Sequence, residues 1–126
     1  MWLLLKEKRK IETSQDLISA VYQRDLDIAS LAPVVIEAAE NGDEVADGIL
    51  SISAEDLCDH VAAILPQLDA PIPLVLGGSL LDSRNILSQK VRLNIQTRFP
   101  NLKIQEPNHP PAVGAALLAF KKPGPL

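Results

Sequence analysis

The chain has 126 residues, of which 47% are hydrophobic, enough to bury the core of one domain. Its formal charge of -4 and its isoelectric point near 5.1 supply no basic surface for a phosphate backbone, which excludes nucleic-acid binding as a main function. Aromatic residues make up only 3% of the chain, which argues against base-stacking platforms and aromatic sugar clamps.

The single cysteine, Cys58, cannot form an intrachain disulfide or a cysteine-based metal site, and it suits a reducing cytoplasm. We interpret it as a small core residue rather than a nucleophile. Two histidines, His60 and His109, lack the spacing of a zinc motif, so we expect no metal site. The apolar residues 1–5 are too few for a signal peptide or a membrane span, and they predict a short helix whose packing partner lies elsewhere.

Three further helices are predicted before residue 70. Thr13 and Asp16 match a capping box that opens a helix over 14–23. A second helix starts near Asp27, is broken or bent near Pro33 and ends at Asn41 and Gly42.

The third helix is predicted over about 44–68, with Asp43 as its N-cap. Ser53 could instead start a new helix, but we favour one continuous helix because nothing there breaks it. The apolar residues at helical spacing, which we expect to form its packed side, are Val45, Ile49, Ile52, Leu57, Val61, Ile64, Leu65 and Leu68.

An unbroken apolar run then ends at two glycines. Residues 74–76 predict a strand over about 73–77 that is buried on both faces. Gly77 and Gly78 allow positive φ and carry no side chain, so a nucleotide could lie against the bare backbone. A plain tight turn after a strand is the alternative reading.

A second strand, over 102–105, follows a helix over about 84–98 that Asp82 or Ser83 would cap. A strand, a helix and a strand at this spacing predict parallel strands joined by a right-handed crossover.

The last helix, over 112–120, has no polar face, so we expect it to be buried. Gly114 and Ala115 would allow another element to pack closely against its first turn. The sequence therefore predicts a single helix-rich α/β domain over 1–120, with four to five helices around the two strands, and a flexible tail over 121–126.

The order of these features resembles the C-terminal part of the superfamily of sugar kinases, actin and heat-shock ATPases. More narrowly, it resembles N-acetylglucosamine kinases and BadF/BadG/BcrA/BcrD-type ATPases. The resemblance spans about 16–120, and its carriers are the segments 31–43, 76–79 and 111–119. It implies a partial ribonuclease H-like lobe of the actin-like ATPase type.

The resemblance also implies roles for single residues. Gly77, Gly78 and Ser79 match the adenosine motif that lies against the ribose and adenine of ATP. Gly114 and Ala115 match the small residues of the connecting helix at the interdomain hinge, although close packing alone would explain Gly114 equally well. The full-length protein would use ATP and Mg²⁺ to phosphorylate a sugar hydroxyl.

The phosphate motifs of the family, of the Asp-x-Gly-x-Thr type, are not found in this chain, and neither are the sugar-binding residues or the catalytic aspartate. The nearest segment, 47–50, falls inside a predicted helix. We therefore expect a fragment that is inactive as a kinase, with no catalytic residue and no certain cofactor of its own.

Three other functions have to be weighed. A non-catalytic interaction module that retains the fold is the main alternative. An ATPase of the radical-dehydratase activator type needs cysteines for an iron–sulfur cluster, and Cys58 stands alone. A Rossmann dinucleotide domain lacks its Gly-x-Gly-x-x-Gly spacing.

In the family the sheet has five strands, and the two here would be its last. The resemblance thus implies an open apolar edge on the first strand. We expect either a homo-oligomer, a two-fold dimer through that edge, or pairing with the missing N-terminal lobe, and no membrane partner.

Overall fold

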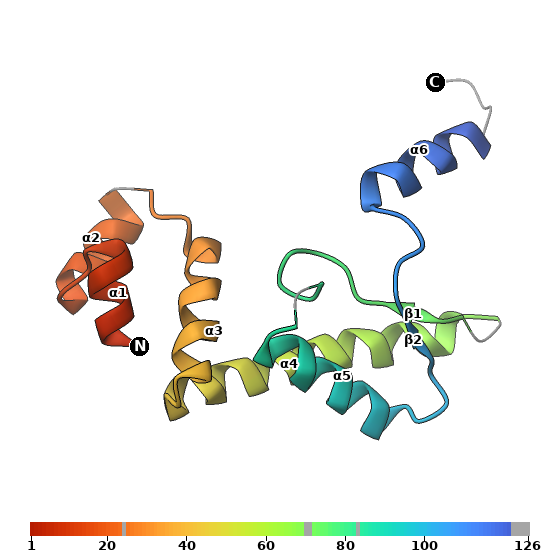
Figure 1. Cartoon of the computed structure of the whole chain (residues 1–126), viewed down its shortest axis with the longest axis horizontal. Helices are drawn as coiled ribbons and strands as arrows, with labels where there is room; N and C mark the ends of the chain where they lie inside the picture. Colours follow the sequence, from red (N-terminus) through yellow and green to blue (C-terminus); the bar gives the residue numbers. More distant parts are fainter. Residues whose placement is uncertain (24, 70–71, 83, 122–126) are drawn as a thin grey trace.

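The computed structural model describes residues 1–23, 25–69, 72–82 and 84–121. Helices α1 to α3 precede a long α4, and a short strand on each side of α5 leads to α6 (Figure 1). The helices are α1 (Trp2–Arg9), α2 (Ser14–Gln23), α3 (Ala32–Glu40), α4 (Glu44–Ile64), α5 (Ile86–Arg98) and α6 (Pro111–Lys121). The strands are β1 (Leu74–Val75) and β2 (Ile104–Gln105), and short 3₁₀ turns precede α3 and follow α4.

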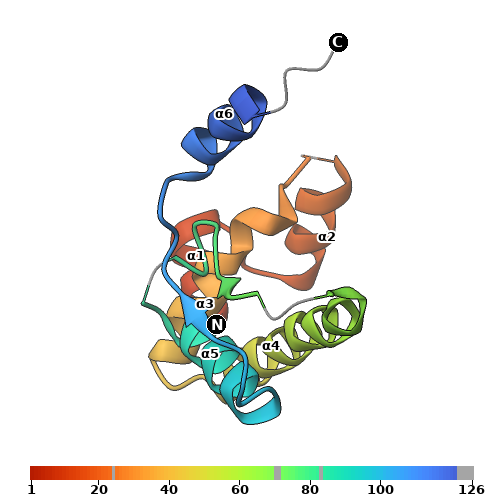
Figure 2. The same cartoon turned by 90° about the vertical axis from the view of Figure 1, so that its right-hand side faces the viewer.

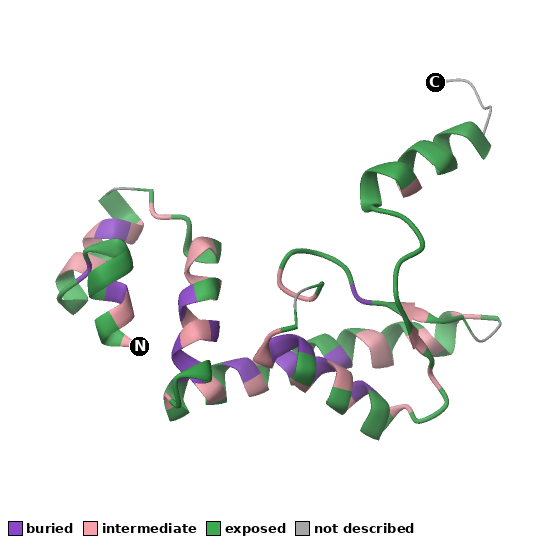
Figure 3. Ribbon diagram, viewed as in Figure 1, coloured by how far each residue is buried: buried purple, intermediate pink, exposed green. Residues whose placement is uncertain are grey.

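Two apolar clusters meet at α3 (Figure 3). The first joins Leu5 of α1 and Ala20 of α2 to Ile11 and to Val34 of α3. The second joins α3, α4, α5 and the end of β1, and its buried residues are Ile36, Ala38, Ala39, Ala46, Leu50, Ala54, Cys58, Leu76, Leu87, Val91 and Ile95. Helix α1 therefore finds its partner within this chain, although Trp2 and Leu3 stay exposed.

Helix α4 is continuous through Ser53, whose hydroxyl donates to the carbonyl of Ile49, so the single-helix prediction is confirmed. The predicted packed side is wrong. Buried residues recur every four positions at Ala46, Leu50, Ala54 and Cys58, whereas large residues such as Val45, Ile49 and Ile52 are exposed. Small side chains are favoured on the packed side of α4 because they let α3 and α5 approach the helix closely.

The predicted helix starts are confirmed for α2 and α4. The hydroxyl of Thr13 accepts from the N–H of Asp16 at 3.1 Å, and the carboxylate of Asp16 accepts in return from the N–H of Thr13 at 2.9 Å. Asp43 accepts from the N–H of Ala46 at 2.9 Å.

The predicted cap of α5 is wrong. The helix begins at Ile86, and Asn85 caps it through a reciprocal box with Ser88. The alternative candidate Ser83 lies outside the described residues, while Asp82 belongs to the preceding turn.

The two strands pair in parallel, as predicted, with Leu74 opposite Ile104 and Val75 opposite Gln105. The first pair packs against the second cluster, whereas Val75 is 42% exposed and Gln105 is exposed. The expectation of a strand buried on both faces is therefore wrong, because within the described chain helices cover only one face of this short sheet.

Helix α6 is formed as predicted, but the expectation that it is buried is wrong. None of its described residues is buried, and it extends away from the rest of the molecule (Figure 2). Lys121, the first residue of the predicted tail, still belongs to α6, and residues 122–126 lie outside the described part. Among the described helices, none is both long and apolar enough to cross a membrane.

Candidate functional site

The two glycines follow β1 at the edge of the sheet where both strands end. Leu76, which directly follows β1, is buried in the core, and Gly77 and Gly78 come next. Because the strands are parallel, Glu106, which follows β2, lies at the same edge. In open parallel sheets, ligands bind outside the carboxyl ends of the strands.

The glycine turn is held by its own backbone. Gly78 has a φ of +99°, which favours glycine, and its carbonyl accepts from the N–H groups of Leu81 at 3.0 Å and Asp82 at 2.9 Å. A Cβ added to Gly77 or Gly78 would meet no atom within 4 Å. Both glycines thus present bare backbone to open space, which would allow the flat face of a nucleoside to approach.

A polar cavity of about 460 Å³ begins beside this turn. Asp82, which is hydrogen-bonded to Gly78, forms one wall, and Glu106 forms another. Its lining residues are Asp82, Arg84, Ser88, Gln89, Arg92 and Glu106. Arg92 donates to Glu106 across 3.2 Å and so links α5 to the segment after β2. Carboxylates, an amide and guanidinium groups together can bind the hydroxyls and ring nitrogens of a nucleoside.

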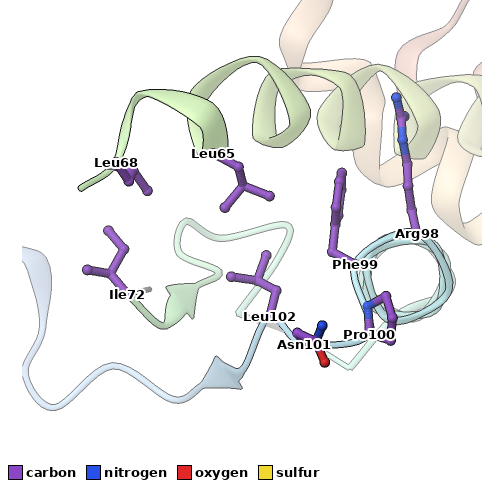
Figure 4. A pocket seen from close by; sticks show the side chains of 8 residues that line it. All are labelled: Leu65, Leu68, Ile72, Arg98, Phe99, Pro100, Asn101 and Leu102. Atoms are coloured by element: carbon purple, nitrogen blue, oxygen red, sulfur yellow. The ribbon is translucent and has the colours of Figure 1, made fainter. Parts of the chain in front are cut away.

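A second cavity, of about 400 Å³, is apolar and lies between the end of α4 and the turn after α5 (Figure 4). Leu65, Leu68, Ile72 and Leu102 converge on it, and Phe99 stands at its side beneath the Arg98 guanidinium, 5.6 Å from the ring centre. Most of its lining residues are apolar, so the cavity offers mainly packing surface.

Comparison with known proteins supplies the family. Residues 19–119 match the BadF/BadG/BcrA/BcrD ATPase family. The chain belongs to this family. The matched range covers the glycine turn, the residues that line the polar cavity and most of α6.

Two curated relatives of this BadF-type chain are sugar kinases. The chain is 33% identical over 125 residues to N-acetyl-D-glucosamine kinase of Dictyostelium discoideum, covering 93% of this chain and 39% of the relative. It is 29% identical over 116 residues to N-acetylmuramic acid/N-acetylglucosamine kinase of Clostridium acetobutylicum, covering 87% of this chain and 38% of the relative. The chain thus spans about two fifths of the length of these relatives. No solved structure gives a significant match.

The one segment of this BadF-type chain that approaches a phosphate motif has a structural role. Asp47 and Gly48 lie inside α4. The Nζ of Lys90, on α5, lies 2.9 Å from Oδ1 and 3.0 Å from Oδ2 of Asp47 and forms an ion pair with this carboxylate. The same ammonium also donates to Ser51. In the part of the chain that the structure describes, no group of three histidine, cysteine or acidic residues is placed to hold a metal ion.

The structure does not bring the predicted hinge residues to the glycine turn. Gly114 and Ala115 lie on α6, and this helix is separated from the glycine turn in both views (Figures 1 and 2). A Cβ on Gly114 would meet no atom within 4 Å, so no described element packs closely against it. Their hinge role stays a prediction.

Cys58 is buried, and desolvation raises the pKa of its thiol, which agrees with a core residue. The polar cavity, by contrast, was missed in the sequence. A signal for it does exist, since Glu106 directly follows the second of two parallel strands, where ligand-binding side chains gather. Arg92 carries no comparable signal, because its place on α5 follows only from how that helix packs.

Proposed function

We propose that this chain is the C-terminal, nucleotide-side part of an ATP-dependent amino-sugar kinase similar to N-acetylglucosamine kinase. The observation that carries the proposal is the glycine turn at the carboxyl ends of β1 and β2, with its backbone open to approach. The family is one of ATPases, and both curated relatives are named as kinases of amino sugars.

In this proposal the chain binds and orients adenosine. The peptide planes of Gly77 and Gly78 would lie against the adenine and ribose, where any side chain would intrude. Ser79 is exposed beside them, and the carboxylates of Asp82 and Glu106 would accept hydrogen bonds from the ribose hydroxyls. ATP supplies the phosphoryl group when it is bound.

Phosphoryl transfer also needs residues that hold the phosphates, the Mg²⁺ ion and the acceptor hydroxyl in line. The sequence lacks the family's phosphate motifs. Asp47, which lies in the segment most similar to such a motif, forms an ion pair with Lys90. We therefore infer that this chain alone binds nucleotide without transferring phosphate, and that transfer to an amino sugar belongs to a full-length protein.

A non-catalytic interaction module is the second candidate function. It is favoured by the large apolar residues that α4 and α6 expose. The activator-type ATPase has less support, because its iron–sulfur cluster needs several cysteines and Cys58 lies buried in α4.

Calorimetric titration of the chain with ADP, with and without Mg²⁺, tests the nucleotide proposal. We expect saturable binding that Gly77→Ala weakens at least about tenfold, since the methyl group would occupy the space of the nucleoside. Gly77 does not have a positive φ and has no neighbours there, so the variant should fold normally.

Gly48→Ala is the matched control, because Gly48 lies on the exposed side of α4 with equally open space around it. Its affinity for ADP should equal that of the wild type. A wild-type chain that folds but shows no saturable binding of ADP would contradict the proposal and favour the interaction module.

A further inference from the structure

An ion pair joins two walls of the polar cavity. The Nη2 group of Arg92, on α5, donates to Oε1 of Glu106 at 3.2 Å. Both residues line the cavity, which begins beside the glycine turn. The Arg92 side chain is 35% exposed and the Glu106 side chain is 81% exposed. A pair this exposed contributes little to the stability of the fold, so its main effect is on the position of the carboxylate.

Arg92 is the better anchored of the two partners. It lies in α5 between Val91 and Ile95, which are each 1% exposed and fix this helix in the core. Glu106 follows a strand of two residues, and residues 106–110 are all exposed. Among the described residues, Arg92 is the sole hydrogen-bond partner of the Glu106 side chain. Because an unpaired glutamate side chain samples several rotamers, the ion pair selects where this carboxylate lies.

The carboxylate of Glu106 keeps the capacity to accept hydrogen bonds from a ligand. Arg92 contacts Oε1, while Oε2 has no partner among the described residues. An ionised carboxylate only accepts hydrogen bonds, and each of its oxygens offers two lone pairs. The two vicinal hydroxyls of a ribose can both donate, so one carboxylate can receive both of them. Such charge-assisted hydrogen bonds are about twice as strong as neutral ones.

We propose that Glu106 binds the vicinal hydroxyls of the ribose and that Arg92 is the positioning residue that holds its carboxylate for them. The pair makes the site selective for ribonucleotides over nucleotides that lack these hydroxyls. The cavity of about 460 Å³ has the size of a small-molecule site. This inference rests on the proposed nucleotide function and assigns the recognition of the sugar within it.

Asp82 is the competing acceptor, because its carboxylate lines the same cavity. Its backbone N–H donates to the carbonyl of Gly78, so its main chain follows the glycine turn. Glu106 is favoured because a cation holds its carboxylate in the cavity, whereas no ion pair within the described part of the chain holds that of Asp82.

Calorimetric titration of the chain with ADP and with 2′,3′-dideoxy-ADP tests the inference, because the second nucleotide lacks only the two hydroxyls. We expect the wild type to bind ADP about tenfold to a hundredfold more tightly, since hydrogen bonds to a charged acceptor are lost with the analogue. Glu106→Ala should reduce this ratio of affinities to less than about threefold. A merely structural role would weaken the binding of both nucleotides equally and leave the ratio unchanged.

Variants of Arg92 separate positioning from direct contact. Arg92→Gln removes the cation and should lower the ratio about three- to fivefold, as expected for an exposed ion pair. Arg92→Lys keeps the charge and should restore most of the ratio, because the pair depends on a single contact. In the Glu106→Ala background, Arg92→Gln should change the ratio by less than about 1.5-fold, since Arg92 acts through Glu106.

Arg98→Gln is the matched control. Arg98 also lies on α5 and also forms an ion pair, with Asp59, but it does not line the polar cavity. Its ratio of affinities should equal that of the wild type. Circular dichroism checks that each variant is folded, which the exposure of the Glu106 side chain favours.

The results distinguish this inference from the nucleotide proposal on which it rests. A chain that binds ADP and 2′,3′-dideoxy-ADP equally well would overturn the inference and leave nucleotide binding intact. A ratio that only Asp82→Ala lowers would overturn it in favour of Asp82. A further loss when Arg92→Gln is added to Glu106→Ala would overturn the positioning role, because Arg92 would then contact the nucleotide itself. A folded chain without saturable binding of ADP would contradict both proposals.

Discussion

The centre of the molecule and its C-terminal arm use apolar residues in opposite ways. Where α3, α4 and α5 meet, small and medium side chains such as Ala46, Ala54 and Val91 are almost completely buried. In α6, larger side chains such as Leu118 are exposed to water. The contrast shows that hydrophobicity identifies a helix that needs a partner, while the size of the side chains decides how closely a partner can approach.

Removing the same number of carbons in the two regions gives the largest expected difference. Ile95→Ala, in the centre, should lower the free energy of unfolding by about 2–5 kcal/mol, because it leaves a cavity where the side chain is 1% exposed. Leu118→Ala should change it by less than about 0.5 kcal/mol in dilute, monomeric protein. Urea denaturation measures both, and equal losses would contradict the distinction between the two regions.

The glycine turn, which follows β1 beside the central helices, sharpens the comparison. Gly78→Ala should destabilise the chain by about 1–2 kcal/mol, since its φ of +99° forces a side chain into the left-handed region. Gly48→Ala, within α4, should instead stabilise the chain by up to about 1 kcal/mol, because alanine favours the helix and meets no neighbour. Thermal unfolding followed by circular dichroism compares them, and a neutral Gly78→Ala would show that the turn is adaptable.

Acid should weaken the start of α4 by a smaller amount. Hydrogen bonding to the N-terminal amine of Met1, together with the N–H of Ala46, lowers the pKa of Asp43. A carboxyl whose folded pKa is lowered contributes its full stability above the unfolded value of about 3.9 and loses it as the pH falls through the folded value.

In the wild type, the urea concentration at the midpoint of unfolding should therefore decrease as the pH is lowered below about 4. Asp43→Asn keeps a good capping side chain but loses the charge, so its midpoint should depend less on pH in that range. Parallel curves for the two proteins would show that the ion pair does not contribute.

Local chemistry allowed much of the fold to be predicted from the sequence. The Thr13–Asp16 box, the Asp43 cap and the parallel strands around α5 depend on residues close together in the chain, and all were predicted correctly. The packed side of α4 was not, because Val45 and Ile49 are more hydrophobic than the alanines that the fold buries. Choosing between two apolar sides requires knowing which other helices are present.

The candidate site was predictable to the same extent. Gly77 and Gly78 stand out because a strand ends at them, and this is a local pattern. The cavity that starts at Asp82 draws Arg92 and Glu106 from different elements, and only tertiary packing brings them together. The expected burial of α6 was wrong. An apolar helix predicts that some surface covers it, but no described element of this chain does so.

Helix α3 is the shared wall of both apolar clusters, since Val34 belongs to one and Ile36 to the other. This nine-residue helix thus couples the packing of α1 and α2 to the packing of α4 and α5. Loosening either cluster should therefore destabilise the other, and the two clusters should unfold in one cooperative step.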